Sequence, residues 1–361
     1  MAADAPSQGA DLREERNSPS LPDLNEAEWY SRPVAAMALL IGSGAALIFC
    51  IIFSTSVGAA DVPLGTVWKA VFSYDPSNTD HIIIHEVRLP RVVAGAMVGV
   101  AFAVAGAIMQ GMTRNPLASP SLMGLNAGAY FMITLGLVFL PWLTLNGLIW
   151  LSFAGAALGA GIVYGIGSMA QGSLTPVKLA LAGIAVSALL SALGEGLVIL
   201  HGEAFQLLLF FAGGVAGTNW GQVQILLPFL IIGLLGGMIL ARNITVLNLG
   251  DDVARGLGQR TALVKAAGSV VVVALAGSAV WVGGPIGFIG LIIPHVARFL
   301  VGLDYRWIIP ASALLGALML VLADLGARMV NPPFETPVGI VTAAVGVPFF
   351  LYLARRDQRG M

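Results

Sequence analysis

The chain has 361 residues, of which 57% are hydrophobic and only 10% are charged. A soluble domain carries about a quarter charged residues, so this chain cannot cover a surface that faces water on all sides. The formal net charge of −1 gives no basic field for a nucleic-acid partner. The one cysteine, Cys50, excludes an internal disulfide framework and a four-cysteine metal site. The composition therefore predicts an integral membrane protein.

The N-terminal segment differs from the rest of the chain. Residues 1–32 carry many charges and three prolines, and they contain no apolar core. This composition excludes a signal peptide and is typical of a disordered extension. We interpret residues 1–33 as a disordered cytosolic tail and residues 355–361 as a short cytosolic C-terminal tail.

Apolar runs of membrane-spanning length fill the region between these tails. A helix needs about 20 apolar residues to cross a bilayer, and continuous rather than alternating apolar runs predict helices instead of barrel strands. Ten candidate spans follow in the sequence: 34–56, 89–112, 121–140, 148–170, 178–200, 222–241, 262–281, 286–301, 308–330 and 337–354.

The positions of the basic residues test this number. Cytosolic loops of membrane proteins are enriched in Lys and Arg. With the N-terminus inside, ten spans place 14 of the 18 basic residues at cytosolic ends, and the outer side keeps Lys69, Arg88, Arg91 and Arg328. An odd number of spans would put the basic C-terminal residues on the wrong side. We therefore predict an all-α polytopic protein with ten transmembrane helices and both termini in the cytoplasm.

Glycine indicates how the spans pack and where they break. The 45 glycines include pairs four residues apart, such as Gly155 and Gly159, and small faces of this kind let helices approach closely in lipid. Residues 57–86 form an outer segment of mixed polarity. Residues 201–221 and 281–290 are glycine-rich interruptions, the first expected to be a short outer helix that partly re-enters the protein. Broken backbone at membrane depth occurs where protein or a water-filled cavity satisfies it, so both interruptions are candidate pathway linings.

The longest polar insertion between spans covers residues 242–261 and faces the cytosol. Gly250 followed by two aspartates is typical of a helix start, and an apolar stripe follows it. A solvated surface loop is the alternative, but it would not need the stripe. We predict a helix of one to two turns outside the membrane that docks a partner. Its stripe is Val253, Ala254 and Leu257, and Gly256 and Gly258 end it.

Several motifs occur in order along the chain: Arg88-Leu-Pro-Arg91, Ala105-Gly106, Met109-Gln110, Asn115–Pro120, Leu249–Gly258, Gly287–His295, Ala323–Arg328 and Pro337–Gly346. In this pattern the chain resembles the iron-siderophore and cobalamin permease family of ABC importers from about residue 34 to residue 354. The resemblance implies a type II ABC importer permease bundle in a bacterial cell membrane. It also implies an iron(III)-siderophore-type chelate as substrate, with haem or cobalamin as alternatives.

The resemblance further assigns roles to individual residues. It implies that an ATPase subunit contacts Leu249, Gly250, Asp251, Asp252, Ala254, Leu257 and Gly258. It implies that Arg88 and Arg328 pair with glutamates of an extracytoplasmic substrate-binding protein. It implies a cytosolic gate at Thr175, Pro176 and Val177, where the position matches but the residue types differ.

The same resemblance implies the partners. They are a cytosolic ATPase dimer that holds ATP and Mg, the binding protein, membrane lipid, and a second permease copy or a paralogue. This chain is expected to bind no cofactor or metal of its own, because the chelate arrives already coordinated. Lys69, Lys178 and Lys265 do not follow a glycine in a phosphate-binding loop, so we expect ATP hydrolysis on the separate subunit.

Polar residues inside spans are candidates for function. Gln110 and Asn126 could contact a substrate or cross-link helices. Glu195 lies among small and apolar residues of the fifth span, where it could contact a ligand as a charge or be a buried neutral acid. A proton-coupled secondary transporter that uses Glu195 and Asp324 is the main rival interpretation, although it would not need the docking segment. An intramembrane enzyme is disfavoured, because no nucleophile–base pair is evident within the spans.

Overall fold

The computed structural model describes residues 32–57, 62–169, 176–201, 214–331, 334 and 336–357. Most of the predicted N-terminal tail therefore lies outside the described residues. Seven described helices are long and apolar enough to cross a membrane, and three shorter apolar helices bring the total to the predicted ten. They are α1 (Pro33–Ser56), α4 (Leu89–Thr113), α5 (Leu125–Phe139), α6 (Leu145–Met169), α7 (Pro176–His201), α9 (Trp220–Asn248), α11 (Thr261–Gly283), α12 (Ile289–Val301), α13 (Tyr305–Val330) and α14 (Val338–Asp357).

The end of α9 departs from the prediction. The predicted span ended at residue 241, but the helix continues to Asn248, so the first third of the predicted polar insertion 242–261 is helical. Ile244 and Leu247 are fully buried in these last turns. The apolar face of α9 thus continues through this polar part of the sequence, and burial of that face keeps these residues helical.

Helix α4 forms the centre of the molecule. It packs against α13, α11, α9 and α12, and almost all of its residues are buried. Small residues allow these close approaches: a Cβ added at Gly106 would collide with the backbone carbonyl of Gly290 in α12, and one at Gly99 would collide with Gly316 in α13. The small faces expected from the sequence therefore set the packing of the central helices.

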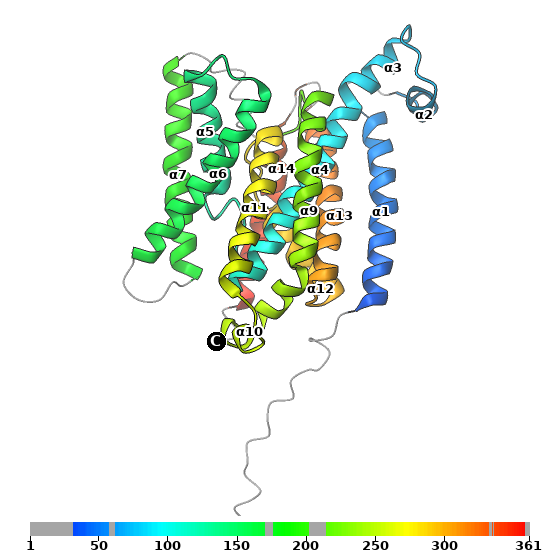
Figure 1. Ribbon diagram of the computed structural model, residues 1–361. Coiled ribbons are helices and arrows are strands. Elements are labelled where there is room, and N and C mark those ends of the chain that lie inside the picture. Colours follow the sequence, from blue (N-terminus) through cyan, green and yellow to red (C-terminus); the bar gives the residue numbers. More distant parts are fainter. Residues whose placement is uncertain are drawn as a thin grey trace, which may run out of the picture.

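Helices α5, α6 and α7 form a second group beside this centre, at the left of Figure 1. Gly128 of α5 and Gly155 of α6 meet backbone to backbone, so that a Cβ on either would collide with the other's carbonyl oxygen. Helix α11 packs on both α5 and α6 and joins this group to the centre. Helix α7 lies at the margin of the molecule.

The outer segment of mixed polarity is mainly helical. It contains α2 (Leu64–Phe72), α3 (Thr79–Ile83) and the single π-helical turn η2 (Ile84–Arg88), which runs directly into α4. In Figure 1 this segment projects beyond the end of α1. The Trp220 ring nitrogen at the start of α9 donates to the carbonyl oxygen of His85 at 2.8 Å, which fixes η2 against α9.

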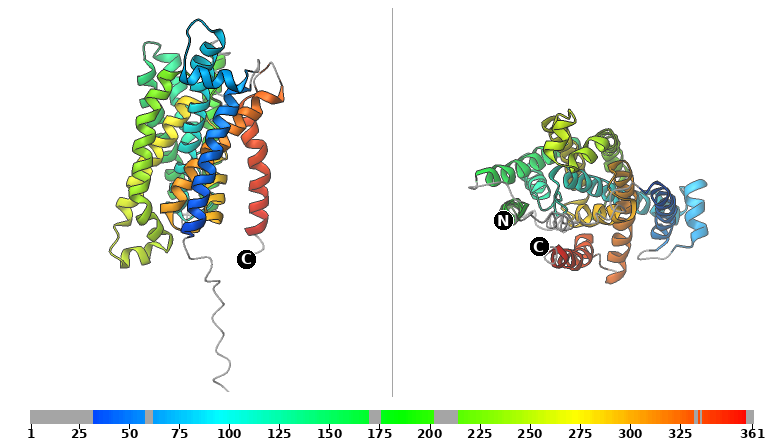
Figure 2. Two further views of the ribbon diagram at one scale, coloured as in Figure 1. Left: turned by 90° about the vertical axis from the view of Figure 1, so that its right-hand side faces the viewer. Right: turned by 90° about the horizontal axis from the view of Figure 1, so that it is seen from below.

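The predicted interruption at 281–290 is present. Helix α11 ends at Gly283 and α12 begins at Ile289, and Gly284 and Phe288 take positive φ angles in the link. The first turn of α1 and the last turn of α14 lie at the same end of the molecule (Figure 2). The short helix α10 (Asp251–Gly256) lies at that end as well (Figure 1). Residues 202–213 of the other predicted interruption lie outside the described residues.

Candidate functional site

The coupling segment, residues 249–260, lies between α9 and α11 and contains α10. The predicted start and end of its helix are confirmed: α10 spans Asp251–Gly256. Gly250 precedes it with a φ of 120°, and Gly258 follows it with a φ of 80°. These left-handed conformations favour glycine. Two sharp turns therefore hold a short helix across the ends of the longer ones.

The two sides of α10 face different surroundings. Leu257 is 68% exposed, and Leu249 and Val253 are each 48% exposed, whereas Ala254 is fully buried. The expectation that Ala254 belongs to the partner-facing stripe is therefore wrong. Its side chain faces this chain's own α9 and α11, against which α10 packs. The apolar surface open to a partner consists of Leu249, Val253 and Leu257.

Asp251 fastens the coupling segment to the bundle. Its carboxylate accepts a 2.6 Å hydrogen bond from Nζ of Lys265 in α11 and lies 4.0 Å from the Arg114 guanidinium at the end of α4. The Lys265 hydrogen bond is the main reason why the pKa of Asp251 lies below its ordinary value. Asp252, one residue further on, has a fully exposed side chain. Adjacent aspartates thus differ in role, because one is bound to this chain and the other is open to a partner.

At the opposite end, the two predicted docking arginines meet around the C-terminus of α1. Arg88 donates from Nη1 to the carbonyl oxygens of Thr55 and Ser56 at 2.9 and 3.0 Å. Arg328 donates to the carbonyl oxygens of Ser54 and Val57 and to the Ser54 hydroxyl. Cations near a helix C-terminus satisfy its free carbonyl groups. The two arginines therefore lie at the same end of the molecule, and both side chains are largely buried in contacts within this chain.

The same region contains a buried ion-pair network. Arg91 pairs with Asp324 through Nε and Nη2 at 2.9–3.2 Å, and Nε of Arg328 lies 3.3 Å from the same carboxylate. The side chain of Asp324 is only 2% exposed. Asp324 and Arg328 lie four residues apart on one helix, whereas Arg91 and Asp324 are 233 residues apart in the chain. The sequence feature behind the contact of Arg91 with Asp324 is the second arginine of Arg-Leu-Pro-Arg, which the topology places opposite Asp324.

Asn126 binds the link between α11 and α12, and Gln110 binds the first turn of α12. Nε2 of Gln110 donates to the carbonyl oxygens of Gly290 and Leu291 at 3.1 and 3.2 Å. Nδ2 of Asn126 donates to the carbonyl oxygen of Ile286 at 3.0 Å. Of the two roles considered for these residues, the helix cross-link is the one present. Broken backbone at this depth requires such partners.

Glu195 lies in the C-terminal half of α7. Its side chain is exposed, so the alternative of an acid buried within this chain is wrong. Ala188 and Ala192 on the preceding turns are exposed too, and so are Leu189 and Ile199. A carboxylate in the middle of a spanning helix is costly against lipid. This face of α7 therefore indicates a protein or water-lined boundary.

The predicted gate falls largely outside the described residues. Thr175 is not among them, and Pro176 and Val177 form the first turn of α7, where their side chains are not described. Within the described residues, no group of three or more His, Cys, Asp and Glu residues could hold a metal ion.

Comparison with known proteins relates this arrangement to a transport family. Residues 46–356 match the FecCD transport family. The iron(3+)-hydroxamate import system permease protein FhuB of Bacillus subtilis is 54% identical, over 93% of this chain and 88% of that protein. The ferric enterobactin transport system permease protein FepD of Escherichia coli is 39% identical, over 91% of this chain and 97% of that protein.

A solved structure extends the comparison to the fold. A chain described as a metal-chelate type ABC transporter in an inward-facing conformation superposes with a TM-score of 0.73 at 27% identity. The alignment covers 89% of this chain and 99% of that one. The family match and the full-length relatives together show that this chain belongs to the FecCD transport family.

Proposed function

We propose that this chain is the permease subunit of an ATP-driven importer for iron(III) chelates of the hydroxamate-siderophore class. The observation that carries the proposal is the 54% identity, over nearly the whole chain, to a permease named for iron(3+)-hydroxamate import. The ten-helix bundle with a coupling segment at one end supports it. The iron arrives as part of the chelate, so the permease has to guide a bulky complex rather than ligate a metal ion.

The coupling segment is the proposed contact with the ATPase dimer, which would hold ATP and Mg. Leu249, Val253 and Leu257 present apolar surface, and Asp252 and Arg255 flank it with exposed charges. An apolar centre with a charged rim is the usual anatomy of a protein interface. The fixed attachment of Asp251 to α11 would transmit movement of the ATPase to the bundle. This assignment puts the α10 end of the molecule, with both termini, in the cytoplasm.

The exposed face of α7 is the proposed boundary with a second permease copy or a paralogue. Glu195 gives this apolar face a polar centre, and the small residues Ala188 and Ala192 leave room beside it. A charged group is expected where two subunits enclose a hydrated pathway, and Glu195 would then contact the chelate or its water. Glu195→Gln should change the uptake rate or the apparent affinity by more than twofold, whereas Ser168→Ala at the far end of α6 should not.

Docking of a substrate-binding protein by Arg88 and Arg328 stays a prediction. Both arginines already hold the end of α1, so a glutamate at either position would disturb this chain as well as a partner. A binding-protein affinity for such a variant is informative only if its thermal stability is unchanged. The rival assignment of Asp324 as a proton site is not supported by its geometry, because its buried side chain is already paired with Arg91 and Arg328.

The proposal is tested by the range of chelates that depends on this chain. Cells that lack it should lose uptake of radioactive iron supplied as a hydroxamate chelate, and plasmid-borne wild type should restore uptake. Catecholate and citrate chelates, haem and cobalamin supplied in parallel define the specificity. Unchanged hydroxamate uptake, with loss of one of the others, would contradict the assignment of the chelate class.

A further inference from the structure

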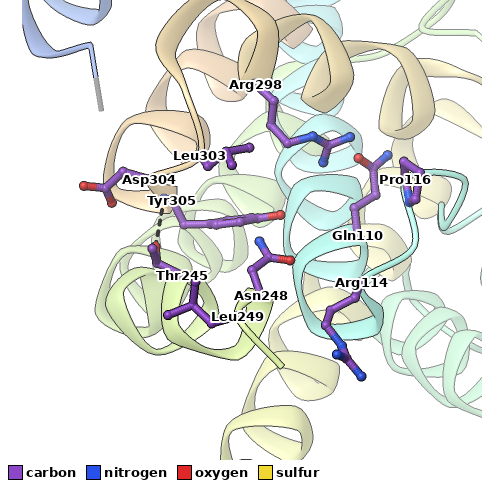
Figure 3. Close-up of a pocket in the computed structure, with 10 residues that line it drawn as sticks. All are labelled: Gln110, Arg114, Pro116, Thr245, Asn248, Leu249, Arg298, Leu303, Asp304 and Tyr305. Atoms are coloured by element: carbon purple, nitrogen blue, oxygen red, sulfur yellow. Dashed lines mark hydrogen bonds between the residues drawn. The ribbon is translucent and has the colours of Figure 1, made fainter. Parts of the chain in front are cut away.

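A pocket of about 590 Å³ opens between helix ends near the coupling segment. Its walls come from the end of α4, the end of α9, the last part of α12 and the start of α13 (Figure 3). None of its described lining residues belongs to α7, the helix of the proposed boundary between permease copies. Cavities of about 300–1,000 Å³ are typical of sites for small organic ligands.

Two buried polar atoms at one wall of this pocket have unmet hydrogen bonds. Among the described residues, Nη2 of Arg298 and Oε1 of Gln110 have no hydrogen-bond partner, and Gln110 is only 2% exposed. Figure 3 shows the Arg298 guanidinium and the Gln110 amide facing each other at one end of the pocket. A buried donor or acceptor without a partner is destabilising, most of all when it is charged. A ligand that both accepts and donates hydrogen bonds would satisfy both atoms.

Further donors and the local charge define the ligand more closely. The hydroxyl group of Tyr305 points into the pocket beside the Asn248 amide (Figure 3). The one acid among the ten described lining residues is Asp304, and its carboxylate is held by Nε and Nη2 of Arg306 at 2.9 and 2.7 Å. Burial raises the pKa of Asp304, but the hydrogen bonds from Arg306 outweigh this effect and lower it. The negative charge of Asp304 is thus balanced by Arg306, and the positive charge of Arg298 is available to a ligand.

We propose that this pocket binds a phosphate ester that carries a free hydroxyl group. The phosphate oxygens would accept from Arg298 and from the Tyr305 hydroxyl, which approach from different directions as a tetrahedral anion requires. The hydroxyl group would donate to Oε1 of Gln110. The volume exceeds what a bare phosphate ion fills. The ligand is either the glycerol-phosphate headgroup of an anionic phospholipid or a soluble glycerol or sugar phosphate.

Occupancy of the pocket would bear on coupling as well as on stability. Leu249 forms part of the wall and is the second residue before α10. A bound ligand would therefore stabilise the coupling segment just before the start of α10. The inference does not depend on which chelate is transported.

The test uses the complete transporter, purified with its partners. For the lipid source, the transporter is placed in discs of phosphatidylcholine, either alone or mixed with phosphatidylglycerol. Native mass spectrometry then counts the phosphatidylglycerol molecules that stay bound after extraction from the discs. For the soluble source, calorimetry measures binding of glycerol 3-phosphate. Arg298→Gln should weaken binding about tenfold or more, since hydrogen bonds to charged groups are the strong ones. Tyr305→Phe removes one neutral donor and should weaken binding severalfold.

Arg260→Gln is the matched control. It removes an exposed arginine that directly precedes α11 and does not line the pocket, and should leave binding within twofold of wild type. Retention of phosphatidylglycerol that Arg298→Gln abolishes supports the lipid source, and calorimetric binding with the same dependence supports the soluble source. If neither probe binds, the pocket holds only water and the proposal is overturned. If Arg260→Gln weakens binding as much as Arg298→Gln, the binding reflects general surface charge and the proposal is likewise overturned. Thermal unfolding of each variant separates lost binding from lost folding.

Discussion

Truncation of Leu257 tests the contact between the coupling segment and the ATPase. Leu257 is 68% exposed on the partner-facing side of α10, and complete burial of a leucine side chain contributes about 1.5–3 kcal/mol. Burial of the part that is still exposed is therefore worth about 1–2 kcal/mol. Leu257→Ala should weaken ATPase binding about 5- to 30-fold, because 1.4 kcal/mol corresponds to a factor of ten. Leu257→Asp should weaken it further, because it adds a charge that the contact would have to desolvate.

The assay is the affinity of the purified ATPase subunit for the permease in lipid discs, with ATP-driven uptake measured in parallel. Leu235→Ala is the control, because Leu235 is 58% exposed in the middle of α9, far from the coupling segment. It should leave ATPase affinity unchanged. Ala254→Arg gives a contrast: Ala254 is fully buried, so this change should lower the yield of folded permease. Wild-type affinity in Leu257→Asp would refute the assignment of this face.

Three further predictions address the packing and the charges. Asp324→Asn should destabilise the permease by about 3–5 kcal/mol, since it leaves buried arginines without a counter-charge; thermal unfolding in detergent measures this, and an unchanged midpoint would contradict it. Gly106→Val should prevent close contact with Gly290 at a cost of about 1–3 kcal/mol or more; a folded variant of normal stability would refute it. Because its pKa is depressed, the Asp251 contribution is full above its unfolded-state pKa of about 3.8 and falls at lower pH. Asp251→Asn should therefore raise hydrogen exchange in α10 at pH 7, and equal exchange in wild type would contradict this.

The helices could be predicted from the sequence because their signals are local. Continuous apolar runs and the asymmetry of Lys and Arg predicted ten spans, and Gly250 followed by Asp251 marked the start of α10. The glycines between 283 and 290 marked the break before α12. In each case the signal and the element share the same few residues, so no knowledge of the packing is required.

The side-chain environments could not be predicted in the same way. Ala254 and Leu257 belong to one apolar stripe, and only the packing of α10 on α9 and α11 decides which of them is buried. Arg91 and Asp324 are 233 residues apart, so their contact depends on the topology of the whole bundle. The exposure of Glu195 likewise depends on which helices flank α7. The candidate docking, coupling and pathway roles therefore rest on contacts that experiments on the assembled complex have to test.

Reconstitution of the complete complex tests the central claim most directly. The permease, its second copy or paralogue, the ATPase dimer and the binding protein are placed in proteoliposomes with the iron(III)–hydroxamate chelate supplied on the binding-protein side. Accumulation of radioactive iron should require ATP and should stop when the phosphate-binding lysine of the ATPase is changed. Accumulation driven by a proton gradient without ATP, or no accumulation of any iron chelate by the active complex, would contradict the account.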